Sequence, residues 1–250
     1  GMSAAYLPSL TPPIHPGIDP VNALVDPTHP GSPTYRTQMD NNGNQFLTLM
    51  RAWETGGAGR SNFLVFGSAG NTRLRFGTPH DYQARDNSLI ANVAARWASP
   101  DPLAPLPNGG AGADHFLSVE AMDALGNRSS FSAAGGTVSA PGTAVRSTEF
   151  NNGVSYDAND AGDQNNATQN GTSLATPHVT GLAAYLWSLD SSLSYQDVRG
   201  LLTNPNYRVA VPAGPQGGSA GAERIDAFAP VLGIDIIQRN TKIQEALVDV

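Results

Sequence analysis

The 250-residue sequence contains no cysteine, which excludes a disulfide framework, a thiolate metal site and a cysteine nucleophile. Charged residues are scarce, at 14% of the chain, and the 21 acidic side chains outnumber the 14 basic ones. The net charge is -7, and the basic residues form no cluster. A partner with a phosphate backbone is therefore disfavoured, and we expect no nucleic-acid binding.

Long apolar runs are missing as well. The longest candidates are residues 63–66 and 182–187, far shorter than the roughly 18 residues that a membrane-spanning helix needs. The first residues contain neither a basic segment nor an apolar one, so the chain shows no signal peptide. We expect a soluble chain without a membrane partner.

Glycine and proline are abundant, with 27 and 19 copies, which is typical of a loop-rich globular protein rather than a helical bundle. Apolar runs predict strands at residues 21–25 and 62–66. Between them, residues 42–55 have helical periodicity, with Phe46, Leu49, Met50 and Trp53 on one face. Strand, helix and strand in this order predict a parallel sheet and an α/β fold.

The rest of the chain continues this alternation. Residues 173–189 are small or apolar almost all round, which predicts a helix that is buried on every face. After Ser88, a helix with Ile90, Val93, Ala94 and Trp97 on one face is predicted, with a strand as the alternative because the segment contains β-branched residues. The other predicted elements are a Pro/Gly-rich loop at 100–112, strands at 116–119, 129–132 and 137–140, a helix at 195–202 capped by Ser192 or Ser194, and a helix at 223–232.

The most informative stretch is residues 170–181, NGTSLATPHVTG. Gly171 permits a sharp turn, and Ser173 then lies in the first turn of a predicted helix, where free N–H groups and the helix dipole favour negative charge. An ordinary capping serine is the alternative interpretation. The stretch resembles Gly-Thr-Ser-x-Ala-x-Pro-His-Val-x-Gly, the serine motif of the subtilisin-like serine peptidases (subtilases). The resemblance implies that Ser173 is the nucleophile and that His178 is structural.

A second segment resembles the same family. Residues 63–71, FLVFGSAGN, are similar to the subtilase strand that ends in Ala-Ala-Gly-Asn. The resemblance implies that the Asn71 amide and the Ser173 backbone N–H stabilise the oxyanion. It also implies that Ser68, Ala69 and Gly70 line the pocket for the substrate side chain. Taken alone, Gly70-Asn71 would be interpreted as a turn.

Two further motifs of the family are absent from the sequence. Neither Asp-[Ser/Thr]-Gly nor His-Gly-Thr-His occurs, and none of the histidines at positions 15, 29, 80, 115 and 178 is followed by Gly-Thr. His15 and His29 lie in proline-flanked loops and are interpreted as solvated. Without a base, a serine hydroxyl is a poor nucleophile at neutral pH. We therefore expect this chain to be the serine-bearing, C-terminal portion of a subtilase domain, inactive by itself.

The resemblance implies a subtilisin-like three-layer α/β fold with a mostly parallel sheet and a central buried helix after Ser173, incomplete on its N-terminal side. We expect a proline-rich lead-in at residues 1–20, a partial catalytic domain at 21–232 and a C-terminal extension at 233–250. The resemblance also implies a protein or peptide substrate and an extracellular or cell-envelope location for the parent protein. An uncovered sheet edge would favour a homodimer.

Oxygen-bearing side chains gather at residues 157–166, DANDAGDQNN. Ala161 at a ligand position and Thr168 in place of the closing Glu exclude an EF-hand, so a solvated polar loop is preferred over a calcium site. No other cofactor or metal is expected. Two functions stay open: a serine endopeptidase that forms an acyl-enzyme on Ser173, with Asp and His in the parent chain or a partner, and a catalytically silent subtilase-like binding or structural domain.

Overall fold

The computed structural model describes residues 32–56, 61–71, 83–98, 105–146, 150–151, 155–156, 169–213 and 221–248. Several sequence predictions lie outside these residues: the lead-in at 1–20, the strand at 21–25, the oxygen-rich loop at 157–166, and the three histidines His15, His29 and His80.

A five-stranded sheet forms the centre of the fold, in the order β1-β2-β3-β7-β6. Strands β1 (Val65–Ser68), β2 (Phe116–Met122), β3 (Val138–Pro141) and β7 (Gly221–Ile225) are parallel neighbours, and β6 (Arg208–Val211) runs antiparallel to β7. A separate antiparallel pair joins β4 (Phe150–Asn151) and β5 (Ser155–Tyr156). The α/β fold with a mostly parallel sheet, which the sequence predicts, is confirmed.

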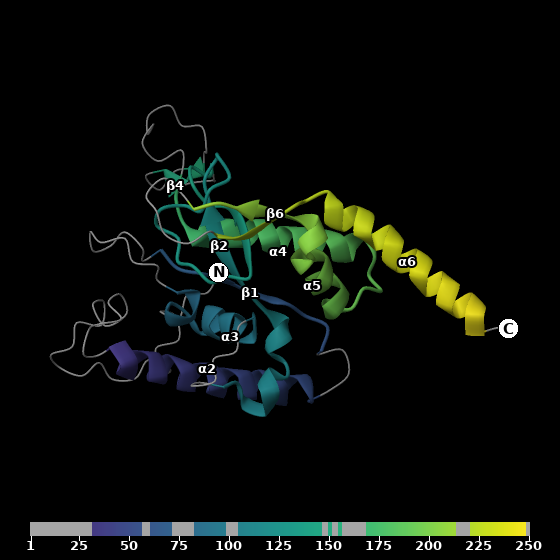
Figure 1. The fold of residues 1–250 in the computed structure, drawn as a ribbon, viewed down its shortest axis with the longest axis horizontal. Coiled ribbons are helices and arrows are strands. Elements are labelled where there is room, and N and C mark those ends of the chain that lie inside the picture. The colour runs from purple at the N-terminus through teal and green to yellow at the C-terminus, as the bar shows by residue number, and fades with distance from the viewer. Residues whose placement is uncertain are drawn as a thin grey trace.

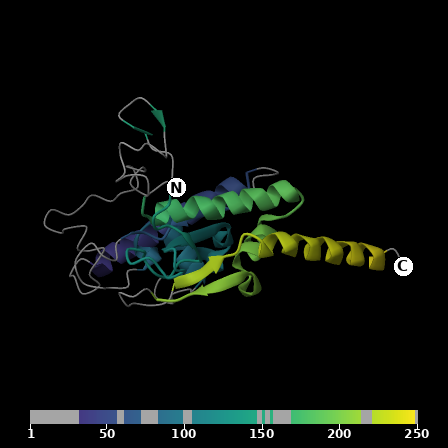
Figure 2. The same ribbon diagram turned by 90° about the horizontal axis from the view of Figure 1, so that it is seen from above.

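Helices cover both faces of this sheet (Figures 1 and 2). Helices α2 (Ser32–Glu54) and α3 (Leu89–Ala98) pack on one face. Helix α4 (Thr172–Leu189) packs on the other, together with α5 (Tyr195–Thr203) and the first part of α6 (Ala229–Val248). The far end of α6 extends away from the body of the molecule (Figure 2).

Strand β2 shows how the sheet divides the core. All seven of its residues are buried. Phe116 contacts the cluster that contains Leu47 of α2 and Val93 of α3. Val119 and Ala121 belong instead to the cluster beneath α4. Because successive side chains of a strand point to opposite faces, a strand enclosed by two helical layers is apolar along most of its length.

Local capping explains where two of the predicted helices begin. The Ser88 hydroxyl accepts a hydrogen bond from the N–H of Ala91 at 3.1 Å, which satisfies a free donor at the start of α3. At α5, Ser194 and Asp197 form a capping box, in which each side chain bonds to the other's backbone N–H. Ser194, and not Ser192, is therefore the N-cap.

Two predicted elements are wrong. Residues 223–232 are not one helix, because Gly221–Ile225 forms β7 and α6 begins only at Ala229. The predicted strand at 129–132 is a turn, in which the N–H of Ser132 donates to the carbonyl of Ser129 at 2.9 Å. In both stretches a few apolar residues fit either period, and tertiary pairing decides between them.

Two other predictions hold in part. Helix α2 begins at Ser32, ten residues before the predicted start at 42, and buries Leu47 completely while Leu49 and Trp53 are 61% and 44% exposed. Helix α4 is not buried on every face, since Tyr185 is 53% exposed. Helix α6 continues across residue 232, and the division of the chain into domains stays a prediction.

Short 3-10 turns complete the described chain. They are η2 (Ala84–Asp86), η3 (Pro107–Gly110), η4 (Ala113–His115) and η5 (Pro205–Tyr207). Within the predicted Pro/Gly-rich loop, the described part from residue 105 onward folds back on the core, because Leu106 packs beside α2 and α3.

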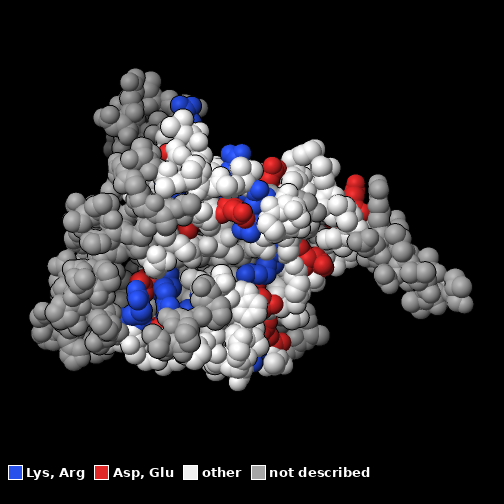
Figure 3. All heavy atoms as spheres, viewed as in Figure 1, with Lys and Arg blue, Asp and Glu red and all other residues white. Residues whose placement is uncertain are grey.

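On the face seen in Figure 3, the charged side chains of the described residues lie in small groups of mixed sign among uncharged ones. None of the described helices combines the length and the apolar character needed to cross a bilayer.

Candidate active site

The sequence-predicted site residues come together at the carboxyl ends of the parallel strands β1, β2 and β3, where α4 begins. The N–H of Gly142, after β3, donates to the carbonyl of Met122 at 3.0 Å. The N–H of Gly171, before α4, donates in turn to the carbonyl of Gly142 at 2.8 Å. A Cβ at Gly142 would lie 2.8 Å from the Gly171 oxygen and 2.5 Å from the Ala121 Cβ. This close approach, which glycine allows, fixes the start of α4 against the sheet.

Thr172 and Asn71 join α4 to the chain after β1. Thr172 is buried, and both its backbone N–H and its hydroxyl donate to the Asn71 Oδ1, at 2.9 and 2.8 Å. The Thr172 hydroxyl also accepts from the N–H of Gly70 at 3.1 Å. Since both bonds hold the amide oxygen of Asn71, the amide nitrogen is turned the other way.

That nitrogen faces the same small space as the Ser173 hydroxyl. A Cβ built on Gly171 would lie 2.8 Å from the Ser173 Oγ and 3.4 Å from the Asn71 Nδ2. The absence of a side chain at Gly171 therefore leaves a volume bordered by one nucleophilic oxygen and one amide donor. Neither the Ser173 N–H nor the Asn71 Nδ2 donates to an acceptor among the described residues. Both residues are exposed to solvent.

Ser68, Ala69 and Gly70 lead from β1 to this space. Ala69 is fully buried, and its N–H donates to Val119 in β2. Gly70 has a φ of +108°, which a side chain would strain, and a Cβ there would lie 2.5 Å from the Asn87 Cγ. Gly70 is thus confined between Thr172 on one side and Asn87 on the other.

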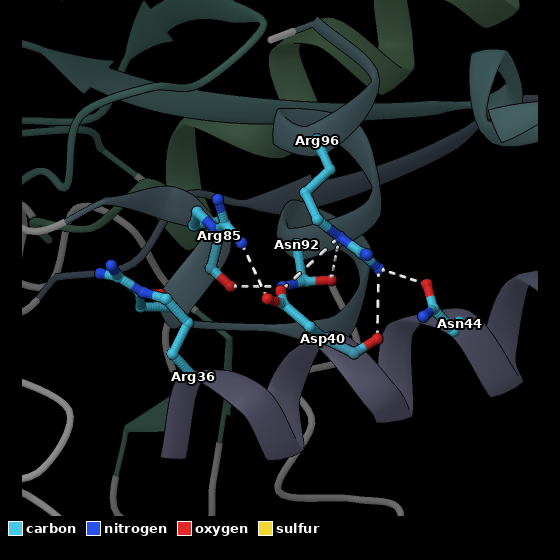
Figure 4. Close-up of polar contacts among 7 residues, drawn as sticks. Arg36, Asp40, Asn44, Arg85, Asn92 and Arg96 are labelled. Carbon is cyan, nitrogen blue, oxygen red and sulfur yellow. Dashed lines mark hydrogen bonds and ion pairs between the residues drawn. The ribbon is translucent and has the colours of Figure 1, made fainter. Parts of the chain in front are cut away.

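A buried polar network holds η2, which directly precedes Asn87. Its core is a set of contacts around Asp40 of α2 (Figure 4). Arg85 donates to the Asp40 carboxylate at 2.8 Å, and the Asn92 amide donates to Asp40 at 2.7 Å and to the carbonyl of Arg85 at 2.9 Å. Arg36 adds a two-pronged ion pair with Asp86. The network joins α2, η2 and α3, and so fixes the position of Asn87 next to Gly70.

The two described histidines lie away from the Ser173 hydroxyl. His178 is exposed on α4, with its Nδ1 2.9 Å from the carbonyl of Leu174. His115 is buried directly before β2, at the amino ends of the parallel strands. Its Nδ1 lies 2.8 Å from the carbonyl of Phe63, and its Nε2 pairs with Glu54. Neither imidazole is placed to take a proton from Ser173.

His115 belongs to a second polar cluster, at the amino ends of the parallel strands. Its ring is stacked between those of Phe63 and Tyr195, with centroids 4.2 and 3.7 Å away. Burial, followed by the hydrogen bond from the phenol to Asp114, raises the pKa of Tyr195. Burial lowers the pKa of Arg199, whose guanidinium donates to the carbonyl of Asp114 at 2.7 Å. The sequence analysis missed this cluster because its members are far apart in the chain.

The sequence analysis also gave no role to Thr172 or Asn87. Thr172 stood inside the serine motif, so the motif carried a signal for it. Asn87 carried none, because its contact with Gly70 arises only from the fold. Among the described residues, no group of three or more His, Asp or Glu side chains is arranged to hold a metal ion.

Comparison with known proteins identifies the family of the chain. The model of the subtilase family matches residues 9–224. The chain belongs to the subtilase family. It is 37% identical over 101 residues to a subtilisin of Bacillus sp. (strain TA39), a match covering 40% of this chain and 20% of that protein. It is 38% identical over 93 residues to subtilisin DY of Bacillus licheniformis, covering 36% of this chain and 30% of the relative.

A solved cold-adapted subtilisin-like serine proteinase matches 46% of this chain and 37% of its own, at 26% identity and a TM-score of 0.35. The subtilase relatives named above are longer proteins. The matched part of this chain spans 30% or less of each curated relative's length.

Proposed function

We propose that this chain carries the nucleophile and the oxyanion-binding part of a serine endopeptidase site, with Ser173 as nucleophile and Asn71 as side-chain donor. The observation that carries the proposal is the shared space at Gly171. There, the Thr172 bonds to the Asn71 Oδ1 direct the Nδ2 toward the volume that the Ser173 Oγ borders. Donors fixed in advance where charge develops are the main source of transition-state stabilisation in acyl transfer.

The proposed reaction is peptide or ester hydrolysis in two steps. The Ser173 Oγ forms a bond to the substrate carbonyl carbon while a base removes its proton. The carbonyl oxygen gains negative charge and accepts from the Asn71 Nδ2 and the Ser173 N–H. The leaving group departs with a proton, and water then cleaves the acyl-serine. Ser68, Ala69 and Gly70 would border the bound side chain.

The base is the component that the described residues do not supply, since both described imidazoles are engaged elsewhere. Because the full sequence also lacks the Asp and His motifs of the family, we expect the chain alone to show only residual hydrolysis, on the order of 10³–10⁴ over water. This expectation is also the specific reason to keep a silent binding or structural domain as the second candidate. A protein or peptide partner and an extracellular or cell-envelope location belong to both proposals.

Chemical rescue separates the two candidates. Imidazole added to the assay supplies a diffusible base, and hydrolysis of an activated peptide ester is followed for the wild type, Ser173→Ala and Ser188→Ala. Ser188 lies on the same helix near its other end, so its loss is the matched control. The peptidase proposal predicts an imidazole-dependent rate that wild type and Ser188→Ala share and that Ser173→Ala lacks. Equal rates in all three proteins at every imidazole concentration would favour the silent domain.

A further inference from the structure

Gly70, which directly precedes Asn71, is held from three sides. Its N–H donates to the Thr172 hydroxyl at 3.1 Å, and its carbonyl accepts from the N–H of Ala133 at 2.9 Å. The third side is steric, because a Cβ at Gly70 would lie 2.5 Å from the Asn87 Cγ. The φ of Gly70 is +108°, a conformation that residues with a side chain rarely adopt. The direction in which the chain enters Asn71 therefore depends on these three contacts.

Two of the three contacts originate from one short turn, η2. Asn87 is the residue that follows this turn. Ala84, in the turn, donates from its N–H to the carbonyl of Ala134 at 2.7 Å. Ala134 directly follows Ala133, whose N–H bonds to Gly70. Ala84 and Ala133 also belong to the same buried cluster of alanines. A displacement of η2 would therefore disturb both segments that border Gly70.

Two ion pairs tie η2 to α2 (Figure 4). Arg85 donates from Nη2 to the Asp40 carboxylate at 2.8 Å, and both side chains are largely buried. Asp86 accepts from Arg36 at 2.9 and 2.6 Å. Hydrogen bonds between charged groups are stronger than those between neutral groups, and the two-pronged form also fixes the geometry. The position of this three-residue turn is therefore set from α2.

Asp40 is fixed in turn from α3. The Asn92 amide donates to Asp40 at 2.7 Å and to the carbonyl of Arg85 at 2.9 Å. Arg96 is buried, and its guanidinium donates to the Asn92 Oδ1 at 3.0 Å and to the Asn44 Oδ1 at 2.9 Å. Truncating Asp40 or Arg96 would leave a buried charge of opposite sign behind and disturb the whole contact between α2 and α3. Loss of the Arg85 side chain, in contrast, leaves Asp40 bound to Asn92 and close to Arg96.

We propose that Arg85 is a positioning residue for the oxyanion donor Asn71. Its bond to Asp40 holds η2, and η2 holds Gly70 in the conformation that directs the Asn71 side chain. This inference rests on the proposed function, because it gives Arg85 a part in the transition-state stabilisation assigned to Asn71. A displacement of about 1 Å far from the chemistry can lower a rate about 10²-fold, so a small movement of η2 is sufficient.

The orientation of Asn71 can be followed without any catalysis. Arg85→Met removes the guanidinium and keeps an unbranched side chain. Asn44→Ala is the matched control, since Asn44 belongs to the same network but bonds to Arg96 instead of η2. The side-chain amide signals of Asn71 and the backbone amide signal of Gly70 are expected to shift in Arg85→Met and to keep their wild-type positions in Asn44→Ala. Unshifted signals in a folded Arg85→Met protein would overturn the proposal.

Two milder substitutions extend this measurement. The Arg36 side chain is 43% exposed, so Arg36→Gln perturbs the same turn, through Asp86, with little risk to folding. It should shift the Asn71 and Gly70 signals in the same direction as Arg85→Met, but less. Arg85→Lys keeps a positive charge for the same partner and should return the signals toward their wild-type positions. Wild-type signals in Arg36→Gln would overturn the proposal even if the methionine variant failed to fold.

A double-mutant cycle separates positioning from a general loss of stability. With imidazole as base and saturating ester, Arg85→Met should slow acylation of Ser173 about tenfold with little change in KM, whereas Asn44→Ala should not slow it. In the Asn71→Ala background, the added Arg85→Met should slow acylation by no more than about twofold, because the group through which Arg85 acts is gone. An equal loss in both backgrounds would overturn the proposal. A wild type without acylation at Ser173 would instead refute the proposed function, and the amide signals would still decide whether Arg85 fixes Asn71.

Discussion

Replacing Thr172 by valine tests the bond pattern that orients Asn71. The substitution keeps the shape of the side chain but removes a buried hydroxyl that donates to the Asn71 Oδ1 at 2.8 Å and accepts from the Gly70 N–H at 3.1 Å. Two hydrogen bonds are lost at about 1 kcal/mol each, and the Gly70 N–H is left without its acceptor. The free energy of unfolding should fall by about 2–4 kcal/mol.

The matched control is Thr176→Val, one turn later in the same helix. Thr176 is equally buried, but its hydroxyl donates only to the carbonyl of Thr172, at 2.8 Å. That carbonyl oxygen also accepts a backbone hydrogen bond within the helix. Its loss should lower the free energy of unfolding by about 1 kcal/mol or less. Urea unfolding followed by tryptophan fluorescence measures both variants. Thr172→Ser, which keeps the hydroxyl, should restore most of the loss.

Equal stability of the two valine variants would refute the reasoning, because it would mean that the bonds between Thr172 and the Asn71 segment contribute nothing beyond those within α4. A shift of the Asn71 side-chain amide signals in Thr172→Val, but not in Thr176→Val, gives an independent readout of the amide orientation.

Three further predictions concern other parts of the fold. In urea unfolding, Gly70→Ala should lower the free energy of unfolding more than Gly109→Ala does. Both glycines have positive φ, but a Cβ at residue 70 would meet Asn87, whereas a Cβ at residue 109 would meet open space. Equal losses of unfolding free energy in the two variants would contradict this. Hydrogen bonds from the backbone N–H groups of Ala229 and Phe228 lower the pKa of Asp226. The carboxylate therefore stabilises the fold above the usual carboxyl pKa of about 4, and this stabilisation is lost as the pH falls through the lowered pKa of the folded state. In Asp226→Asn, the free energy of unfolding should depend less on pH in this acidic range, and an unchanged pH profile would argue against the reasoning. Helix α4 contains no Asp, Glu, Lys or Arg, although Tyr185 and Leu189 are 53% and 46% exposed. Light scattering should therefore find a homodimer, which the double variant Tyr185→Glu/Leu189→Lys converts to a monomer. A wild-type monomer at all concentrations would exclude the homodimer.

The sequence indicated the two segments that meet beside Gly171, whereas it misassigned several outer elements. Ser173 and Asn71, 102 positions apart, were proposed because each lies in a segment that resembles a subtilase motif. Each segment contains a glycine, Gly171 or Gly70, at a position of close backbone approach. Such local requirements leave a signal in the sequence. The capping of α5 by Ser194 was predictable for the same reason, since all its partners lie within one turn.

The misassigned elements depend on partners that are distant in the chain. Residues 221–225 become a strand because β3 and β6 flank them, and periodicity within so short a run cannot show this. The exposure of one side of α4 follows from what packs on it, not from its composition. Asn87 gave no signal because its contact with Gly70 exists only after η2 is fixed by the network around Asp40.

The most direct test of the proposed site is to locate the acyl group. The chain is mixed with an activated peptide ester and imidazole, quenched in acid and mapped by mass spectrometry. The account predicts one acyl group on the peptide that contains Ser173, none in Ser173→Ala, and acylation of Asn71→Ala slower by about 10²–10³, a magnitude measured in subtilisin and carried over to this chain through its family. Acylation at another residue, or at Ser173 with a rate that Asn71→Ala does not change, would contradict it.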